Sequence, residues 1–181
     1  MKTKTKVVVV GGGVVGVSAL YHLAKKGWSD VVLIERKELT SGSTWHAAGL
    51  LPLFNMSYSV GKIHKYSVDL YQNLEEETGQ VVSFHKTGNL RLATNQERMD
   101  EYKRYCGTAS TIGVPFEIIG PQEIKKLWPF AKVDDLVGAL YHPDDGHVAP
   151  VDVTMALLKG ARSRGAETYS EVEVTAMAQK P

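Results

Sequence analysis

The chain has few of the features that mark secreted, membrane-spanning or nucleic-acid-binding proteins. Cys106 is its only cysteine, which excludes an internal disulfide framework and suits a reducing compartment. Its 21 lysines and arginines nearly balance its 20 aspartates and glutamates, so we expect neither nucleic acid nor a membrane as a partner. No apolar run approaches the roughly 20 residues of a transmembrane helix. The 181 residues are enough for one sizeable domain with its own core.

The sequence before the first apolar run bears on location. Residues 1–6 contain no apolar core of a signal peptide and leave no room for a transit peptide. On this ground we expect a cytoplasmic protein.

A glycine-rich stretch near the start organises the rest of the sequence. Four valines, Val7 to Val10, predict a short strand buried on both faces. Gly11, Gly13 and Gly16 then fit the pattern G-x-G-x-x-G. An amphipathic stretch that predicts a helix follows, and a second β-branched run, residues 31–34, predicts another strand. This order of strand, glycine turn, helix and strand is typical of a dinucleotide-binding βαβ unit.

Each glycine of the pattern has its own task. Gly11 permits the tight turn, Gly13 lets the backbone approach a pyrophosphate, and Gly16 lets the helix lie close to the strand. Glu35 ends the second strand, where its carboxylate can accept hydrogen bonds from a ribose diol. The same carboxylate disfavours a ribose that carries a 2′-phosphate. The pattern by itself does not distinguish FAD from NAD.

The segment after Arg36 departs from the helix that a Rossmann dehydrogenase would place there. Residues 37–50 are rich in small and hydroxyl side chains, which suits backbone that passes close to a ligand. Ser43 and Thr44 fit either of two roles, capping of a helix start or hydrogen bonds to phosphate oxygens.

The run from Ser41 to Leu50, SGSTWHAAGL, resembles the flavin-attachment segment of the dimethylglycine and sarcosine dehydrogenases and oxidases. The unit from Val8 to Arg36 is similar to theirs as well. These enzymes are FAD-dependent amine oxidoreductases related to D-amino acid oxidase. The resemblance extends, more loosely, along the whole chain, and the Trp-His-Ala-Ala-Gly run is its more specific part.

The resemblance implies FAD as the cofactor and a covalent bond from the His46 imidazole to the 8α-methyl carbon of the flavin. A neutral imidazole is a good nitrogen nucleophile, which makes histidine a suitable attachment point. Val14, Val15, Glu35 and Arg36 would contact the ADP half. The path toward the isoalloxazine ring would be lined by Gly42, Ser43, Thr44, Trp45, His46, Ala47, Ala48, Gly49 and Leu50.

The rest of the sequence predicts structural elements. Residues 60–74 place apolar side chains, Val60 and Ile63 among them, on one face of a helix. Residues 94–97 have the spacing of a capping box, which would open a helix with Met99, Tyr102, Cys106 and Ala109 inward. Residues 142–147 hold two histidines and two aspartates, but their Pro-Asp-Asp-Gly core is typical of a turn, so we expect no metal.

Alternation over residues 167–177 predicts a strand that returns to the cofactor sheet. The resemblance implies that the backbone of one valine in this strand, Val174, touches the adenine part of FAD.

These elements predict an α/β protein with a Rossmann-like FAD-binding domain, built on the GxGxxG βαβ unit and interrupted by an inserted α+β segment. Residues 1–50 and about 150–181 would form the cofactor sheet. An insertion, about residues 51–149, would contribute to the substrate or cap region. We expect 1–181 to be the N-terminal part of the domain, incomplete at its C-terminus and inactive alone.

The resemblance implies an FAD-dependent dehydrogenase or oxidase that acts on CH–NH donors. Its substrate would be a secondary or tertiary N-methyl amine, similar to dimethylglycine or sarcosine, and a hydride would pass to the flavin. The electron acceptor, oxygen or an electron-transfer flavoprotein, stays open, as do the amine and the oligomeric state. Tetrahydrofolate would be a partner if a folate-binding domain follows. No residue of the chain is a convincing catalytic acid or base.

Two alternatives remain. One is a non-catalytic regulatory homologue, since the pyruvate dehydrogenase phosphatase regulatory subunit resembles these enzymes. The other is a NAD-binding dehydrogenase or reductase, which shares the glycine pattern but has no use for the Trp-His-Ala-Ala run.

Overall fold

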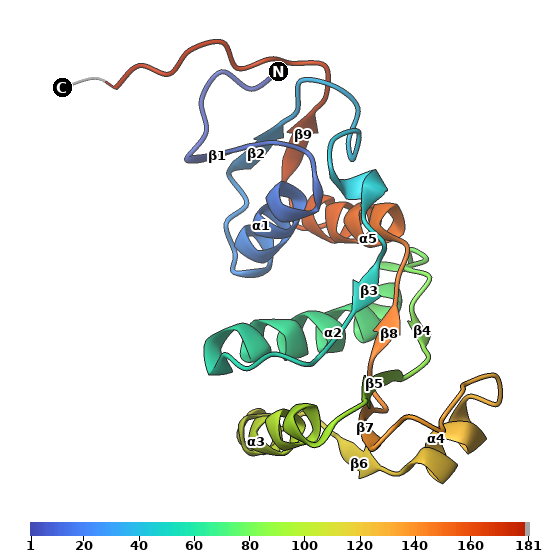
Figure 1. Ribbon diagram of the computed structural model, residues 1–181. Coiled ribbons are helices and arrows are strands. Elements are labelled where there is room, and N and C mark those ends of the chain that lie inside the picture. Colours follow the sequence, from blue (N-terminus) through green and yellow to red (C-terminus); the bar gives the residue numbers. More distant parts are fainter. Residues whose placement is uncertain (180–181) are drawn as a thin grey trace. The chain divides into compact units, whose positions relative to one another are not determined.

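The computed structural model describes residues 1–179, which form two compact units (Figure 1). Unit 1 comprises Met1–Gly49, Tyr71–Ser83 and the chain from Val148 onward; unit 2 comprises Leu50–Leu70 and Phe84–His147. Lys180 and Pro181, the end of the expected cofactor-sheet segment, lie outside the described residues. Of the stretch expected as an insertion, residues 71–83 belong to unit 1.

Unit 1 is built on a parallel sheet, which confirms the expected α/β fold. Strands β1 (Val7–Val10), β2 (Val31–Ile34) and β9 (Glu167–Tyr169) lie in the order β1-β2-β9. Parallel neighbours need a crossover connection, and helix α1 (Val14–Lys25) supplies it between β1 and β2. Helix α5 (Pro150–Arg162) packs against α1 (Figure 1). The buried side chains of the two helices include Val17, Leu20, Tyr21, Ala24, Val153, Ala156, Leu157 and Ala161.

Two expectations for this sheet are wrong. Strand β1 is not buried on both faces, because Val8 and Val10 are 48% and 55% exposed. A β-branched run suits an edge strand as well as a central one, and within the described chain β1 pairs with β2 alone. The strand predicted over residues 167–177 ends at Tyr169. It ends there because Glu171 takes a positive φ of 59°, after which the Val172 N–H donates to the Glu35 carbonyl at 3.0 Å.

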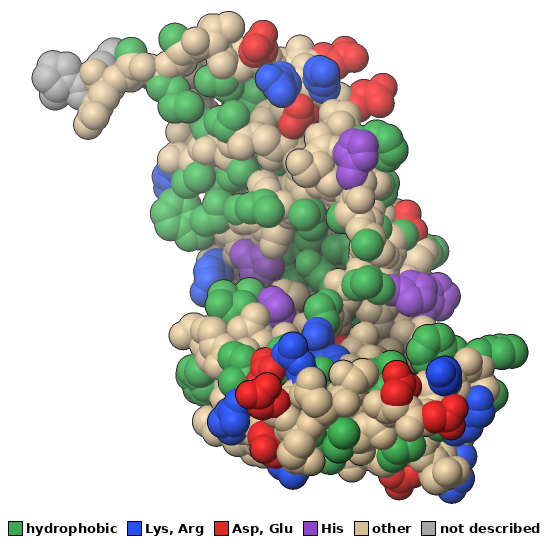
Figure 2. Space-filling view, viewed as in Figure 1, with side chains coloured by type: hydrophobic (Ala, Val, Ile, Leu, Met, Phe, Trp, Pro, Cys, Tyr) green, Lys and Arg blue, Asp and Glu red, His purple; other side chains and the backbone are tan. Residues whose placement is uncertain are grey.

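Unit 2 holds two small antiparallel sheets. Strands β5 (Asn89–Ala93), β7 (Gly138–His142) and β6 (Glu117–Ile119) form one, in the order β5-β7-β6. Strands β3 (Leu50–Leu51), β8 (Gly146–His147) and β4 (His85–Lys86) form the other, in the order β3-β8-β4. Helices α3 (Gln96–Ile112) and α4 (Pro121–Leu127) belong to the same unit. Acidic and basic side chains lie intermixed over α3 and its surroundings (Figure 2). Arg98 and Glu101, on the exposed side of this helix, form an ion pair.

The helices of the middle segment differ from expectation in detail. Asn95, and not Thr94, caps α3, because its Oδ1 accepts a hydrogen bond from the Arg98 N–H at 2.9 Å. Tyr105 takes a fully buried place on α3, while Cys106 is half-buried beside the core. Helix α2 (Tyr58–Thr78) contributes residues to both units.

The buried face of α2 differs in part from the one expected. Leu74 is buried as expected, but Val68 is buried as well, whereas Val60 and Ile63 are 39% and 63% exposed. The apolar spacing predicts that Val60 and Ile63 lie on the inward face of the helix. Spacing alone does not determine how the helix is rotated about its own axis. Within residues 1–179 no helix has both the length and the apolarity needed to cross a membrane.

Candidate functional site

The turn between β1 and α1 has a backbone that only glycine permits. Gly11 has a φ of +112°, and its N–H donates to the carbonyl of Ile34 at 2.9 Å. A Cβ on Gly16 would lie 2.0 Å from the carbonyl oxygen of Gly11. The helix therefore starts directly beside the strand, with Gly13 as the residue before its first turn.

Two backbone amides hold the carboxylate of Glu35 at the end of β2. Its Oε2 accepts a hydrogen bond from the Gly12 N–H at 2.6 Å, and its Oε1 accepts one from the Lys37 N–H at 2.8 Å. The Gly12 N–H is the main reason why the pKa of Glu35 lies below its ordinary value; burial opposes it, and the Lys37 N–H adds to it. Glu35 is thus held as a carboxylate in one orientation.

Gly12 belongs to the site although the glycine pattern assigned it no role. A Cβ there would lie 2.5 Å from Leu39 Cδ2 and 2.9 Å from Glu35 Cβ. The signal that could have found it is the uninterrupted triplet Gly11-Gly12-Gly13, because the pattern itself requires only the outer two.

The loop after β2 is fastened onto the glycine turn. The Thr40 N–H donates to the carbonyl of Gly12 at 3.0 Å. Thr44 Oγ1 accepts a hydrogen bond from the Val14 N–H at 2.9 Å. Thr44 Oγ1 thus caps the start of α1, and a hydrogen bond from its hydroxyl to a phosphate stays a prediction. Ser43 is exposed.

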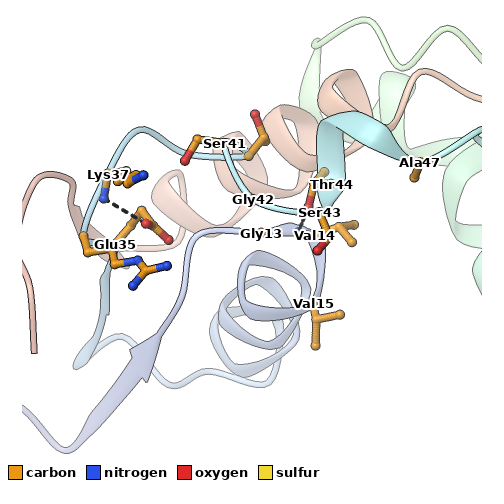
Figure 3. A pocket seen from close by; sticks show the side chains of 12 residues that line it. Gly13, Val14, Val15, Glu35, Lys37, Ser41, Gly42, Ser43, Thr44 and Ala47 are labelled. Atoms are coloured by element: carbon orange, nitrogen blue, oxygen red, sulfur yellow. Dashed lines mark hydrogen bonds between the residues drawn. The ribbon is translucent and has the colours of Figure 1, made fainter.

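The glycine turn, Glu35 and this loop enclose a cavity of about 550 Å³ (Figure 3). The N-terminal end of α1 and the basic residues Arg36 and Lys37 lie at its wall, an arrangement that favours an anion. Of these lining residues, Lys37, Thr40 and Ser41 were missed in the sequence. The lining consists of Gly13, Val14, Val15, Glu35, Arg36, Lys37, Thr40, Ser41, Gly42, Ser43, Thr44 and Ala47.

Glu35 also lines a second cavity, of about 310 Å³. Val174 lines it together with Gly11 and Arg36, so the segment after β9 does reach the end of β2 even though it is not a strand. The contact of Val174 with an adenine stays a prediction.

The rest of the predicted attachment segment follows the cavity directly. Thr44–His46 form a single turn of 3-10 helix, in which the exposed rings of Trp45 and His46 contact each other at a tilt of 33°, with their centroids 3.7 Å apart. Ala48 is exposed. Gly49 has a φ of +72°, and a Cβ at this position would lie 2.0 Å from the carbonyl oxygen of Val148. Leu50 begins β3 in unit 2. Within the described chain, Trp45, His46, Ala48, Gly49 and Leu50 do not line either cavity.

Of the two histidines and two aspartates of residues 142–147, His142 and Asp145 are buried in unit 2. His142 Nε2 lies 3.1 Å from Tyr105 Oη, and Asp145 Oδ1 accepts a hydrogen bond from the Leu53 N–H at 2.9 Å. Burial is the main cause that lowers the pKa of His142 to about 4 and raises that of Asp145 to about 6. Over residues 1–179, no three or more histidine, cysteine or acidic side chains gather as metal ligands would.

Residues 6–180 match the family described as FAD dependent oxidoreductase. The chain belongs to this family. The expected family is thereby confirmed. Because the family depends on FAD, the alternative of a NAD-binding dehydrogenase or reductase has no support. The residues around the cavity fit such a cofactor, because Gly12 and Gly16 keep the turn tight where a Cβ would clash, and Glu35 is already held as a hydrogen-bond acceptor.

The chain is 47% identical over 180 residues to the mitochondrial dimethylglycine dehydrogenase of Rattus norvegicus, a match that covers 99% of this chain and 21% of that one. It is 40% identical over 174 residues to the mitochondrial pyruvate dehydrogenase phosphatase regulatory subunit of Mus musculus, covering 96% and 20%. The crystal structure of L-proline dehydrogenase from P. horikoshii superposes with a TM-score of 0.91 at 31% identity, covering 98% of this chain and 47% of that one.

The chain thus spans about a fifth of the length of these curated relatives. The prediction of a cytoplasmic protein is wrong against this comparison, because both relatives are mitochondrial proteins. A single cysteine argues against an oxidising compartment but does not distinguish one reducing compartment from another.

Proposed function

We propose that this chain is the cofactor-binding part of an FAD-dependent amine oxidoreductase. The observation that carries the proposal is the Glu35 carboxylate, held by the N–H groups of Gly12 and Lys37 at the wall of a cavity into which α1 directs its N-terminal end. A ribose diol can donate to such a carboxylate, while the positive end of the helix favours a pyrophosphate. Gly11 to Gly16 would hold the pyrophosphate, and Val174 would contact the adenine.

FAD, when bound, supplies the acceptor for a hydride; the chain binds and orients it. We propose His46 as the covalent attachment point, which its exposed side chain directly beyond the cavity favours. Attachment would join an imidazole nitrogen to the 8α carbon of the flavin. Two protons would leave, one from the nitrogen and one from the methyl group, and two electrons would pass to an acceptor such as dioxygen.

The 47% identity to a dimethylglycine dehydrogenase supports a secondary or tertiary N-methyl amine, similar to dimethylglycine or sarcosine, as the substrate. Electrons would leave the flavin for oxygen or an electron-transfer flavoprotein, and tetrahydrofolate would be a further partner in a longer protein. A non-catalytic regulator is the second candidate, which the 40% identity to the phosphatase regulatory subunit favours.

The full-length protein that contains this chain gives the test. Acid precipitation followed by peptide mass mapping is expected to find the flavin mass on the peptide that contains His46, and the variant His46→Ala is expected to bind FAD without a covalent bond. Dye reduction that depends on dimethylglycine or sarcosine would separate the enzyme from the regulator. A flavin-loaded protein that oxidises neither amine supports the regulator, and a protein that incorporates no flavin refutes the proposal.

A further inference from the structure

Thr44 joins two segments that are 30 residues apart in the chain. Its Oγ1 accepts a hydrogen bond from the N–H of Val14, the first residue of α1, at 2.9 Å. The residue is only 6% exposed, so little water competes for this N–H. Figure 3 shows the Thr44 hydroxyl directed at the start of α1 beside Gly13. The fit is close, since a Cβ on Gly13 would lie 3.0 Å from Thr44 Oγ1.

The loop before Thr44 is fixed to the same glycine turn at a second point. The Thr40 N–H donates to the Gly12 carbonyl at 3.0 Å, and Thr40 is 9% exposed with a φ of +66°. A β-branched residue rarely adopts this conformation, and it persists only where its surroundings impose it. The loop is therefore held at both Thr40 and Thr44, which leaves it little freedom to slide along the turn.

His46 follows Thr44 in a single short turn. The Ala47 N–H donates to the Thr44 carbonyl at 3.2 Å and closes this turn, so a displacement of Thr44 moves the His46 backbone with it. The Trp45 ring, whose centroid lies 3.7 Å from that of His46, limits the space open to the imidazole on one side.

We infer that Thr44 is a positioning residue, whose hydroxyl fixes the His46 imidazole relative to the N-terminal end of α1 and thereby permits covalent attachment of the flavin. The inference rests on the proposed function, because it concerns the attachment at His46. The helix end would hold the pyrophosphate, which lies at the middle of FAD, and His46 must reach the far end of the same molecule. Thr44 takes no part in the bond itself, in which imidazole and methyl carbon each lose a proton and two electrons pass to an acceptor such as dioxygen.

Three variants of the full-length protein test the inference. Thr44→Val keeps the shape of the side chain but cannot accept the hydrogen bond, and Thr44→Ser keeps the acceptor. Thr94→Val makes the same change at an exposed threonine that lines neither cavity and serves as the matched control. For each, total bound FAD is measured before acid precipitation, and the flavin that stays on the His46 peptide is measured after it. The ratio of attached flavin to total bound FAD separates attachment from binding. A purely structural defect would lower both quantities together and leave their ratio unchanged.

The ratio is expected to fall at least tenfold in Thr44→Val and to stay within twofold of wild type in Thr44→Ser and Thr94→Val. An unchanged ratio in Thr44→Val, or an equal fall in Thr94→Val, would overturn the inference. If Thr44→Val does not accumulate as folded protein, Thr44→Cys takes its place: its thiol is a weaker acceptor, so a lower ratio is expected and an unchanged one overturns the inference. Wild-type protein without flavin on His46 would refute the proposed attachment as well, whereas flavin on His46 in both wild type and Thr44→Val refutes the inference alone.

Discussion

At the scale of single residues, the site depends on one carboxylate whose two oxygens are both directed by backbone. Glu35 accepts hydrogen bonds from the amides of Gly12 and Lys37, which fixes its orientation before any ligand arrives. Acceptors held in this way lose little conformational entropy on binding, which favours affinity.

Replacing Glu35 by alanine is expected to weaken FAD binding. The ribose would lose a charge-assisted partner worth roughly 1.5–3 kcal/mol, equivalent to about 10- to 150-fold in affinity. The flavin content of the purified protein and FAD titration of the apoprotein measure this loss. Glu38→Ala, at an exposed position three residues further on, is the control, and equal FAD binding in both variants would mean that the ribose is held elsewhere.

Two glycines should respond to alanine in opposite directions. Gly16→Ala would place a Cβ 2.0 Å from the Gly11 carbonyl, so backbone must move and the free energy of unfolding should fall by about 3 kcal/mol. Gly107 lies within α3, where nothing stands within 4 Å of a new Cβ. Gly107→Ala should therefore stabilise by about 0.5–1 kcal/mol, since glycine in a helix is costly. Urea unfolding of both variants checks the contrast, and a loss of stability in Gly107→Ala would contradict it.

At the scale of secondary-structure elements, one carboxylate ties three helical segments of unit 1 together. Glu77, near the end of α2, accepts hydrogen bonds from Tyr21 Oη at 2.5 Å, from Lys25 Nζ at 3.0 Å and from Arg164, just beyond α5, at 2.8 Å. Tyr21 is fully buried, and this burial is the main cause that raises its pKa.

Tyr21→Phe is expected to lower the free energy of unfolding by roughly 1.5 kcal/mol, the low end for a hydrogen bond to a charged group, because Glu77 keeps its other partners. Lys65→Ala removes the exposed pair with Asp69 and should cost less than about 0.5 kcal/mol. Thermal and urea unfolding measure both. Equal effects would show that the Tyr21 hydroxyl contributes no more than a surface contact.

The buried His142 and Asp145 of unit 2 should give opposite pH dependences of stability. The folded pKa of Asp145, about 6, lies above its ordinary 3.8, so its contribution is present at low pH and is lost as the pH rises through 6. The folded pKa of His142, about 4, lies below 6.5, so its contribution is present above pH 6.5 and is lost as the pH falls through 4. Each amounts to roughly 3 kcal/mol, at about 1.4 kcal/mol per pKa unit.

In the wild type the two dependences cancel between pH 4 and 6, and single variants expose them. Relative to wild type, Asp145→Asn should gain stability as the pH rises from 4 to 6, because only the His142 dependence remains. His142→Asn should lose relative stability over the same range. Urea unfolding at pH 4.5, 5.25 and 6 tests the sign. Parallel curves for wild type and both variants would mean that neither group titrates as its burial requires.

At the scale of the whole molecule, the proposed cofactor contacts belong to one of the two units. The cavity walls, Glu35 and the Thr44 loop all lie in unit 1. Because FAD would bind only the folded unit, it should raise the free energy of unfolding by mass action. At a free FAD concentration of 100 times the dissociation constant, the increase is about 2.7 kcal/mol. Hydrogen exchange should slow first in residues 11–16 and 35–44. Protection confined to residues 84–147 would place the cofactor elsewhere.

The site could be predicted well wherever a local pattern encodes it. The βαβ unit, its glycines and Glu35 follow from β-branched runs and fixed spacings, because a tight turn and a close approach each demand glycine at one position. Lys37, Thr40 and Ser41 were not named as site residues, because the composition of residues 37–50 suits a loop close to a ligand without showing which of its residues line the site. Their places in the cavity arise from the path by which this loop returns to the glycine turn.

The sequence by itself determined the α/β class, the dinucleotide-binding turn and, through the SGSTWHAAGL run, the family. Tertiary structure alone decided that Thr44 caps a helix 30 residues away, that the strand after Glu167 stops at Tyr169, and that β1 lies at an edge of the described sheet. The reason is the range of the interactions. Turns and periodicities are set by neighbours in the chain, whereas a cap, a sheet edge and a strand end depend on which distant segment supplies the hydrogen-bond partner.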